Sequence, residues 1–261
     1  MTQPKPHGTG RVVAVFICYR ARATLEAFHR DFPYARVDHA ILVDDASDDG
    51  SYELARSLGI DAHQNPRNVG YGGNLKRALA LALAGGADTI VDLHPDGEYL
   101  PSAIGPALAR VAAGADLVLG NRFAHGRSPR SSGMYAWKVA PLRVLNAVHR
   151  RLVGVAVHDL HQGFRVYTRR LLERVRFETY SDDYLFSFEL LRDAARAGAR
   201  IEEVPVVTRY RGDKRGASLR ASVRYTLGTW AALARRTPQG TLAPLDQRIA
   251  DLLGAKAESF R

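Results

Sequence analysis

Residues 40–63, AILVDDASDDGSYELARSLGIDAH, contain two strand patterns separated by a polar turn and a helix pattern. The apolar run at 40–43 predicts one buried strand, and residues 60–63 predict the next. Between them the spacing of apolar residues predicts a helix at 52–58, which Gly59 ends. Parallel strands require a crossover of this kind, so the stretch predicts a strand–helix–strand unit of an α/β sheet.

The alternation of strand and helix patterns extends over most of the chain. Because β-rich runs followed by helix patterns indicate parallel strands joined by helices, we predict an α/β fold with a mostly parallel, Rossmann-like sheet flanked by helices. Residues 1–236 form the predicted domain, and residues 237–261 predict a C-terminal tail or a loosely packed extension. Further strand patterns lie at 11–18, 89–93, 116–119 and 199–207, and further helix patterns at 74–84, 103–113, 134–151, 171–174, 183–197 and 219–235.

Composition excludes several classes of protein. A chain of 261 residues with 46% hydrophobic residues can bury a full core. The single cysteine, Cys18, excludes an internal disulfide framework and predicts a reducing, cytoplasmic setting. The longest apolar tract, 78–87, is broken by glycines and falls short of the roughly 20 residues that a membrane span needs.

Basic residues are concentrated towards the C-terminal end. The net charge is +10, and the segment 207–236 holds eight arginines and lysines against one aspartate. This charge predicts a local site for nucleic acid, for an anionic membrane surface or for the phosphate groups of a substrate. We expect no nucleic acid, because the sequence shows no helix-turn-helix, zinc or aromatic RNA-binding signature. A non-enzymatic basic nucleic-acid-binding protein remains the remote alternative.

Polar residues follow the predicted strands at the edge where open parallel sheets bind their ligands. Tyr19 follows the first strand, and Asp44 and Asp45 follow the second. Asp96 lies beyond the fourth strand and Arg122 beyond the fifth. Helix capping and a charged β-turn are the alternatives for the aspartates. The convergence of acidic and basic side chains predicts a binding site at this edge.

The segment HPDGE at 94–98 predicts a divalent cation site. Mg²⁺ and Mn²⁺ take oxygen ligands and bridge one or two carboxylates to substrate phosphates. We therefore expect Asp96 and Glu98 to hold Mg²⁺ or Mn²⁺ on a nucleotide diphosphate, with His94 as a third ligand that Mn²⁺ tolerates better. Asn74, at the start of the helix that follows a glycine-rich stretch, is a further donor-binding candidate.

Six motifs in a fixed order resemble one known family. Together they cover about residues 10–230 and resemble the inverting family 2 glycosyltransferases with a GT-A fold, within them the dolichol-phosphate mannosyltransferase-like branch. The motifs are ILVDDASDDGS (41–51), NPRNVGYGGNLKRAL (65–79), DLHPDGEYLP (92–101), DLVLGNRF (116–123), HDLHQGFRVY (158–167) and ARIEEVPVVTRYRGDK (199–214).

The resemblance implies roles in binding the donor and the metal. Tyr19 and the pair Asp44 and Asp45 would contact the nucleoside. Asp96 would bind the metal as the second aspartate of the family's DxD motif, and Glu98 stands where a metal-binding glutamine often stands. The first aspartate of that motif is replaced by a histidine in this chain.

The resemblance also implies basic contacts to the diphosphate. Arg122 matches an arginine near the sugar diphosphate. Arg209, Arg211 and Lys214 resemble the basic loop that closes over phosphates in the lipid-phosphate transferases. Residues 17–21 lack the family's usual Pro, Asn and Glu, so they do not identify the base of the nucleotide.

The predicted function is metal-dependent, inverting transfer of a hexose from a GDP-mannose or UDP-glucose type of donor to a polyprenyl phosphate. Such an acceptor is already an anion and requires no general base. The alternative is a soluble glycosyltransferase acting on a hydroxyl of a polysaccharide or secondary metabolite. A hydroxyl requires a base, for which Asp182 or Asp183 is the first candidate and Asp159 the second. The oligomeric state is not predicted.

The last helix pattern favours the lipid acceptor. Apolar residues repeat at helical spacing on one face and arginines cluster on another, which is typical of a helix that lies on anionic lipid. We expect a cytoplasmic protein that is peripheral on the inner face of the membrane. A helix docked on the core, with a solvated basic face, is the alternative. The apolar residues are Leu219, Val223, Leu227 and Trp230, and the arginines are Arg220, Arg224 and Arg235.

Overall fold

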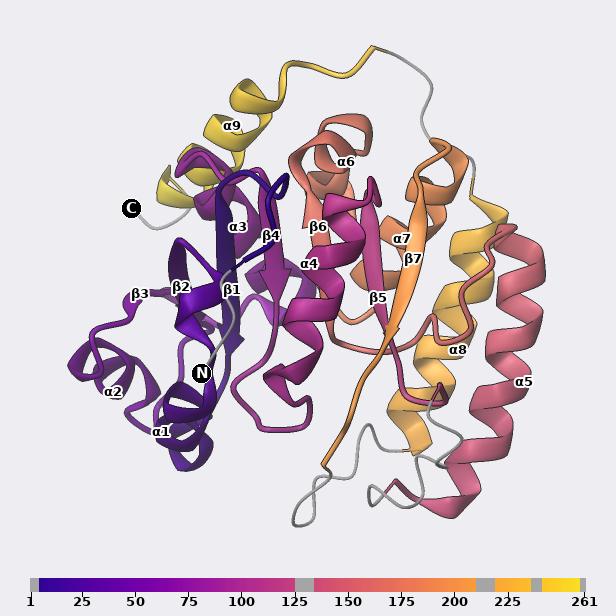
Figure 1. Cartoon of the computed structure of the whole chain (residues 1–261), viewed down its shortest axis with the longest axis horizontal. Coiled ribbons are helices and arrows are strands. Elements are labelled where there is room, and N and C mark those ends of the chain that lie inside the picture. Colours follow the sequence, from indigo (N-terminus) through magenta and orange to yellow (C-terminus); the bar gives the residue numbers. More distant parts are fainter. Residues whose placement is uncertain (1–4, 125–133, 210–218, 236–240, 259–261) are drawn as a thin grey trace.

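A mixed sheet forms the centre of the protein, as Figure 1 shows for this computed structural model. The structure describes residues 5–124, 134–209, 219–235 and 241–258. Within them the sheet has seven strands in the order β3-β2-β1-β4-β6-β5-β7. The strands are β1 (Val12–Cys18), β2 (His39–Asp44), β3 (Asp61–Gln64), β4 (Thr89–Asp92), β5 (Leu117–Asn121), β6 (Arg165–Thr168) and β7 (Ile201–Pro205).

The predicted α/β fold with a mostly parallel sheet is confirmed. β1 pairs in parallel with β2 and β4, β2 with β3, and β5 with β7. The exception is β6, which lies between β4 and β5 and is antiparallel to both. The sequence did not predict β6, because its four residues include an arginine and follow a polar loop without an apolar run.

Helices cover both faces of the sheet. The helices are α1 (Arg22–Asp31), α2 (Ser51–Ser57), α3 (Gly70–Ala84), α4 (Ile104–Ala112), α5 (Ala136–Val153), α6 (Arg169–Arg174), α7 (Phe186–Arg196), α8 (Leu219–Ala234) and α9 (Leu245–Glu258), with short 3₁₀ turns at Tyr34–Arg36, Pro101–Ala103 and Phe177–Thr179. None of the helices described is both long and apolar enough to cross a membrane.

β1 shows how the two layers are built, because all seven of its side chains are buried. Val13, Val15 and Ile17 belong to a core shared with α3, α6, α7 and α9. Val12, Ala14, Phe16 and Cys18 belong to a second core shared with α1, α2 and α4. A strand that is apolar on both faces is typical of the centre of a sheet covered on both sides. The alternation of its side chains therefore fixes β1 between the layers.

The C-terminal helix α9 packs on the first of these cores. Leu245 and Ile249 are buried in it, and α9 contacts α3. Arg248 is also buried, and its guanidinium donates to the Val175 carbonyl at 2.5 Å and to the Glu178 carboxylate at 2.8 Å. The sequence did not predict this helix. The predicted domain boundary after residue 236 lies outside the described residues and stays a prediction.

Candidate active site at the carboxyl edge of the sheet

Asp44 lies buried at the end of β2 and organises the turn that follows. Its carboxylate accepts hydrogen bonds from the Ser47 amide at 2.8 Å, the Ser47 hydroxyl at 2.5 Å and the Gln64 side chain at 3.1 Å. Tyr19, just beyond β1, is 49% exposed. Of these two predicted nucleoside contacts, Tyr19 therefore presents a surface to the solvent, whereas Asp44 is engaged within the protein.

Asp45 and Asn74 join the end of β2 to the start of α3. The Asp45 carboxylate accepts hydrogen bonds from the Val69 and Gly70 amides at 2.8 and 3.0 Å, which satisfies donors at the start of the helix. Asn74 donates to the Val43 carbonyl at 2.9 Å. Both side chains are buried. The structure thus assigns them a role in positioning the edge, and a direct contact to the donor stays a prediction.

His94 pairs with the last residue of β4. Its Nε2 lies 3.5 Å from a carboxylate oxygen of Asp92, whose side chain is fully buried. Burial lowers the pKa of His94, but the neighbouring Asp92 carboxylate outweighs it and holds the pKa above its ordinary value. His94 is thus held against Asp92, and its role as a metal ligand stays a prediction.

Asp96 and Glu98 lie on one turn beyond β4. Asp96 is exposed, and its Oδ1 accepts a hydrogen bond from the Glu98 amide at 2.9 Å. Among the residues that the structure describes, no three acidic, histidine or cysteine side chains form a metal-binding group. Two carboxylates on one turn are nevertheless the set that Mg²⁺ or Mn²⁺ takes when phosphate oxygens complete its shell. Asp96 and Glu98 therefore fit a cation shared with a diphosphate.

The same turn is attached to the chain that follows β7. The Glu98 carbonyl accepts a hydrogen bond from the Arg209 amide at 2.8 Å, and Tyr99 forms an antiparallel bridge with Thr208. The structure thus brings Arg209 beside the predicted metal site. Arg211 and Lys214, the other residues of the predicted basic loop, lie outside the described residues.

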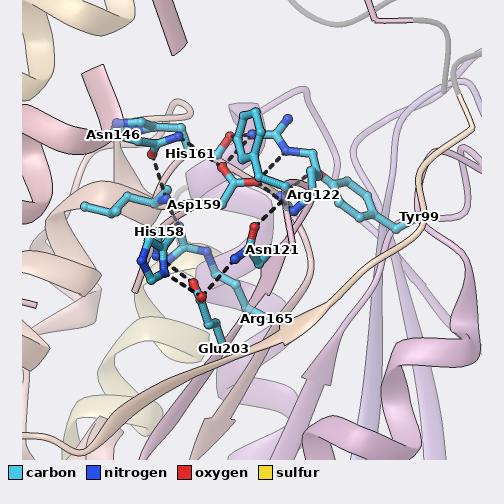
Figure 2. Close-up of polar contacts among 12 residues, drawn as sticks. Tyr99, Asn121, Arg122, Asn146, His158, Asp159, His161, Arg165 and Glu203 are labelled. Atoms are coloured by element: carbon cyan, nitrogen blue, oxygen red, sulfur yellow. Dashed lines mark hydrogen bonds and ion pairs between the residues drawn. The ribbon is translucent and has the colours of Figure 1, made fainter. Parts of the chain in front are cut away.

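Arg122 and Asp159, predicted separately, form one buried ion pair (Figure 2). The Arg122 side chain donates from Nε at 2.7 Å to one Asp159 oxygen and from Nη2 at 2.9 Å to the other. Burial raises the pKa of Asp159, but the Arg122 charge and hydrogen bonds outweigh it and hold the pKa below its ordinary value. Asp159 has no exposed side-chain surface, which does not fit a base that must reach an acceptor.

Glu203 is a residue of this edge that the sequence did not indicate. Its carboxylate accepts hydrogen bonds from the Asn121 side chain at 2.8 Å and the His158 amide at 2.6 Å, and Figure 2 shows it between them. It connects β5, β7 and the loop 158–164. The acidic pair in the predicted strand 199–207 could have indicated Glu203, but Asn121 and His158, which it binds, are far away in the sequence.

Asp182 and Asp183 lie exposed just before α7. Asp182 Oδ1 accepts a hydrogen bond from Lys76 at 2.9 Å, and Asp183 caps the next turn through the Leu185 amide at 2.9 Å. A side chain at Gly72 would collide with the Ser181 carbonyl, so the glycine-rich start of α3 allows this close approach.

The start of α7 lies near the predicted metal turn. The Tyr184 ring is 63% exposed and packs on the Tyr71 ring at 4.8 Å. Burial, together with the charges of Asp96 and Glu98, raises the pKa of Tyr184. Tyr184, which directly follows both exposed base candidates in the chain, is therefore the residue on which the charges of the turn act.

Residues 16–176 match the family described as "Glycosyl transferase family 2". Polyprenol monophosphomannose synthase of Mycolicibacterium smegmatis is 29% identical over 210 residues, which are 76% of this chain and 77% of the relative. Dolichyl-phosphate hexose transferase of Haloferax volcanii is 31% identical over 168 residues, which are 64% of this chain and 68% of the relative.

Solved structures share the architecture. Glucosyl-3-phosphoglycerate synthase of Mycobacterium tuberculosis, in complex with Mn²⁺, uridine diphosphate and glucosyl-3-phosphoglycerate, superposes with a TM-score of 0.65 at 21% identity, over 85% of this chain and 78% of that one. Mannosyl-3-phosphoglycerate synthase of Rubrobacter xylanophilus also superposes with a TM-score of 0.65, at 18% identity, over 89% and 78%. The likeness shows a GT-A fold.

Proposed function

The chain belongs to glycosyl transferase family 2, and on that basis we propose that it transfers a hexose, with inversion, from a nucleotide diphosphate sugar to a polyprenyl phosphate. Two relatives are named polyprenol monophosphomannose synthase and dolichyl-phosphate hexose transferase, and these names support the proposed acceptor. A structural neighbour holds Mn²⁺ and uridine diphosphate, which supports a nucleotide donor and a divalent metal, Mg²⁺ or Mn²⁺. GDP-mannose and UDP-glucose are the proposed types of donor.

The observation that carries the lipid acceptor is an exposed apolar surface on α5 and α8, here called the α5–α8 face. The two helices lie side by side (Figure 1), in contact through His149 and Trp230, whose ring centroids are 5.4 Å apart. Most of the exposed large hydrophobic side chains in the described part of the chain gather here. The α5–α8 face consists of Trp137, Val144, Val148 and Leu152 from α5, and of Val223, Leu227 and Trp230 from α8.

The charge of the two helices indicates which surface they meet. Neither helix contains an aspartate or a glutamate. Their charged residues are Lys138, Arg143, Arg150, Arg151, Arg220 and Arg224. Apolar side chains among cations of one sign are typical of helices that lie on anionic lipid. A polyprenyl phosphate would reach the site from that surface, because α5 begins near the metal turn. Burial lowers the pKa of Lys138 on α5, and the Glu98 charge opposes this effect.

Few residues are needed for transfer to such an acceptor. The exposed Tyr19 ring would contact the nucleoside, and Asp96 and Glu98 would hold the cation. When bound, the cation stabilises the charge of the leaving diphosphate. Arg122, oriented by Asp159, would lie beside that charge. Because the acceptor phosphate is already an anion, we propose that this chain uses no general base.

Replacement of the exposed aspartates tests the acceptor. With polyprenyl phosphate as acceptor, we expect Asp182→Asn and Asp183→Asn to keep kcat within a few-fold of the wild type. A hydroxyl acceptor, the alternative that the exposure of both carboxylates favours, would make one of them the base, and its loss would cost about 10²- to 10⁴-fold. Radiolabelled hexose transfer to polyprenyl phosphate and to polyprenol, measured side by side, gives the answer. Transfer to the alcohol alone would contradict the proposal.

Vesicle binding tests the α5–α8 face. Val144 and Leu227 are each 65% exposed, and we expect the double variant Val144→Ser, Leu227→Ser to bind phosphatidylglycerol vesicles at least about tenfold more weakly, since each apolar side chain buried in lipid contributes about 1.5–3 kcal/mol. Tyr34→Ser is the matched control, because Tyr34 is exposed beyond α1, outside this face. Co-sedimentation measures binding. Equal binding of wild type, double variant and control would argue against a membrane-facing surface.

A further inference from the structure

Four side chains form a continuous series of hydrogen bonds between α8, the loop 158–164 and α5. Tyr225 Oη lies 2.8 Å from His161 Nδ1, and His161 Nε2 lies 3.0 Å from His149 Nδ1. His149 Nε2 lies 3.5 Å from the Thr229 hydroxyl, which donates to the Thr226 carbonyl at 2.7 Å. The series begins and ends on α8 and crosses α5 and the loop. The sequence motifs did not predict this series of hydrogen bonds.

Burial lowers the pKa of His149, and in neutral rings the last bond sets the direction of every other one. Because the Thr229 hydroxyl gives its proton to a carbonyl, it accepts from His149 Nε2. His149 Nδ1 is then the acceptor, so His161 Nε2 donates to it. His161 Nδ1 in turn accepts from the Tyr225 hydroxyl. Each ring then carries one proton, on Nε2, and a second proton on either ring would reverse at least one bond of the series.

The surroundings of the two rings agree with neutral histidines. His161 is close to two cations, Arg122 and Arg165, and to one anion, Asp159. Burial, followed by His149, lowers the pKa of His161 to about 3, against the opposing effect of Asp159. Burial also lowers the pKa of His149. The side chains that pack on the His149 ring from α7 and α8 are aromatic and uncharged, namely Phe188 and Trp230.

The loop that carries His161 also holds Arg122. The His161 carbonyl accepts a hydrogen bond from Arg122 Nη2 at 2.7 Å, two residues beyond Asp159, whose carboxylate binds the same guanidinium. The loop is further fixed to α5 by the Leu160 amide, which donates to the Asn146 side chain at 2.8 Å. Movement of α5 or α8 would therefore displace the backbone on which Arg122 rests.

We propose that Tyr225, His161, His149 and Thr229 form a one-directional hydrogen-bond chain that positions Arg122 and couples it to the α5–α8 face, and that this chain requires both histidines to be neutral. His161 and Tyr225 are positioning residues for Arg122. The coupling to a membrane rests on the proposed function, whereas the positioning of Arg122 does not. Acid would uncouple the site by adding a proton to a ring nitrogen that accepts a hydrogen bond.

Nitrogen-15 NMR of the histidine side chains tests the chain directly in the wild-type protein. We expect His149 and His161 to show the neutral tautomer with the proton on Nε2, unchanged from pH 8 to pH 5. His149→Gln and His161→Gln assign the two sets of signals. A doubly protonated ring at pH 6, or the Nδ1-protonated tautomer at either histidine, would overturn the proposal without any measurement of activity.

Activity variants test what the chain does. Tyr225→Phe removes one hydroxyl, and we expect kcat to fall about tenfold, as for the loss of one buried hydrogen bond. Because His161 Nδ1 would then lack its donor, it would take up a proton more readily, and the acid limb of the pH profile would move to higher pH. A change in kcat with an unchanged pH profile would mean a merely structural role and would overturn the proposal.

The matched control is a pair of threonines on α8. Thr229 and Thr226 both donate to a carbonyl of their own helix, at 2.7 and 2.9 Å, but His149 contacts Thr229 alone of the two. Thr229→Val removes an acceptor from His149 Nε2 and so makes protonation of that ring less favourable. We therefore expect it to shift the acid limb of the pH profile in the opposite direction to Tyr225→Phe, and Thr226→Val to behave as the wild type. If the wild type glycosylates an alcohol instead of a lipid phosphate, the proposed acceptor fails, while this comparison of variants still decides the present inference.

Discussion

The Asp96→Asn variant is expected to lose about 10³-fold in kcat/KM while it melts at the same temperature as the wild type. Asp96 is exposed, and the hydrogen bond that its Oδ1 accepts from the Glu98 amide needs an oxygen but no charge. Asparagine keeps that oxygen, so the turn keeps its shape. What disappears is the negative charge proposed to bind the cation, and the loss of one such electrostatic group costs about 10²- to 10³-fold or more.

Ligand-induced stabilisation provides a measurement that is independent of turnover. A ligand that binds the native state raises the melting temperature by mass action. We expect GDP or UDP to stabilise the wild type when Mn²⁺ is present, and to stabilise Asp96→Asn much less. Asp31→Asn is the control, because Asp31 is an exposed aspartate at the far end of α1. Retained activity with undiminished metal dependence in Asp96→Asn would contradict the metal assignment.

The Asp159→Asn variant is expected to lose about 3–5 kcal/mol of unfolding free energy and roughly 10 °C in melting temperature. Asp159 is fully buried, and the Arg122 side chain that it binds is 7% exposed. Without the carboxylate, Arg122 is a buried charge that has lost its ion pair with Asp159. Urea unfolding at pH 7 gives the free energy, and transfer assays below the transition show whether activity falls with the stability.

The control for Asp159 is an ion pair with similar bonds on the surface. Arg20 donates from Nε and Nη2 to Asp48 at 2.8 and 2.7 Å, but the two side chains are 53% and 68% exposed. We expect Asp48→Asn to leave the melting temperature nearly unchanged, because solvent screens exposed pairs. A loss of less than about 1 kcal/mol in Asp159→Asn would show that the buried pair is not what fastens the loop.

Acid should reduce the difference between wild type and Asp159→Asn. Since the pKa of Asp159 is lowered by Arg122 in the folded protein, its contribution to stability is fully present above the unfolded value of about 4. It is lost as the pH falls through the lower folded pKa. Unfolding curves for both proteins between pH 7 and pH 3 should therefore converge at the acid end.

Local sequence patterns were sufficient to predict the parallel strands, but not β6 or α9. The apolar runs and the glycine that ends each helix predicted the parallel strands, because both signals are local in the sequence. β6 was not predicted, because Arg165 interrupts any apolar run. The burial of Arg165 depends on hydrogen bonds to the carbonyls of Leu160 and Ser187. α9 was not predicted for a similar reason. It places few apolar side chains in the core, and the buried Arg248 adds hydrogen bonds that fix the helix there.

The candidate site shows the same limit. Arg122 and Asp159 were both predicted, one beside the diphosphate and the other as a base. The structure pairs them, because β6 runs antiparallel beside β5 and brings the loop before it to the end of β5. The contact between His94 and Asp92 was not predicted, because the burial of Asp92 is a property of the folded sheet. Which carboxylates face solvent cannot be read from residue types alone.

The place of β6 has a consequence for the chain during synthesis. β4 pairs with β1 on one side and with β6 on the other, and β6 follows much later in the chain. A nascent chain that has completed β1 to β4 therefore carries an unpaired strand edge until α5 and β6 have left the ribosome. Such an edge recruits strands from other chains. We expect chaperone dependence and aggregation in the cell to respond most strongly to changes that delay the arrival of β6.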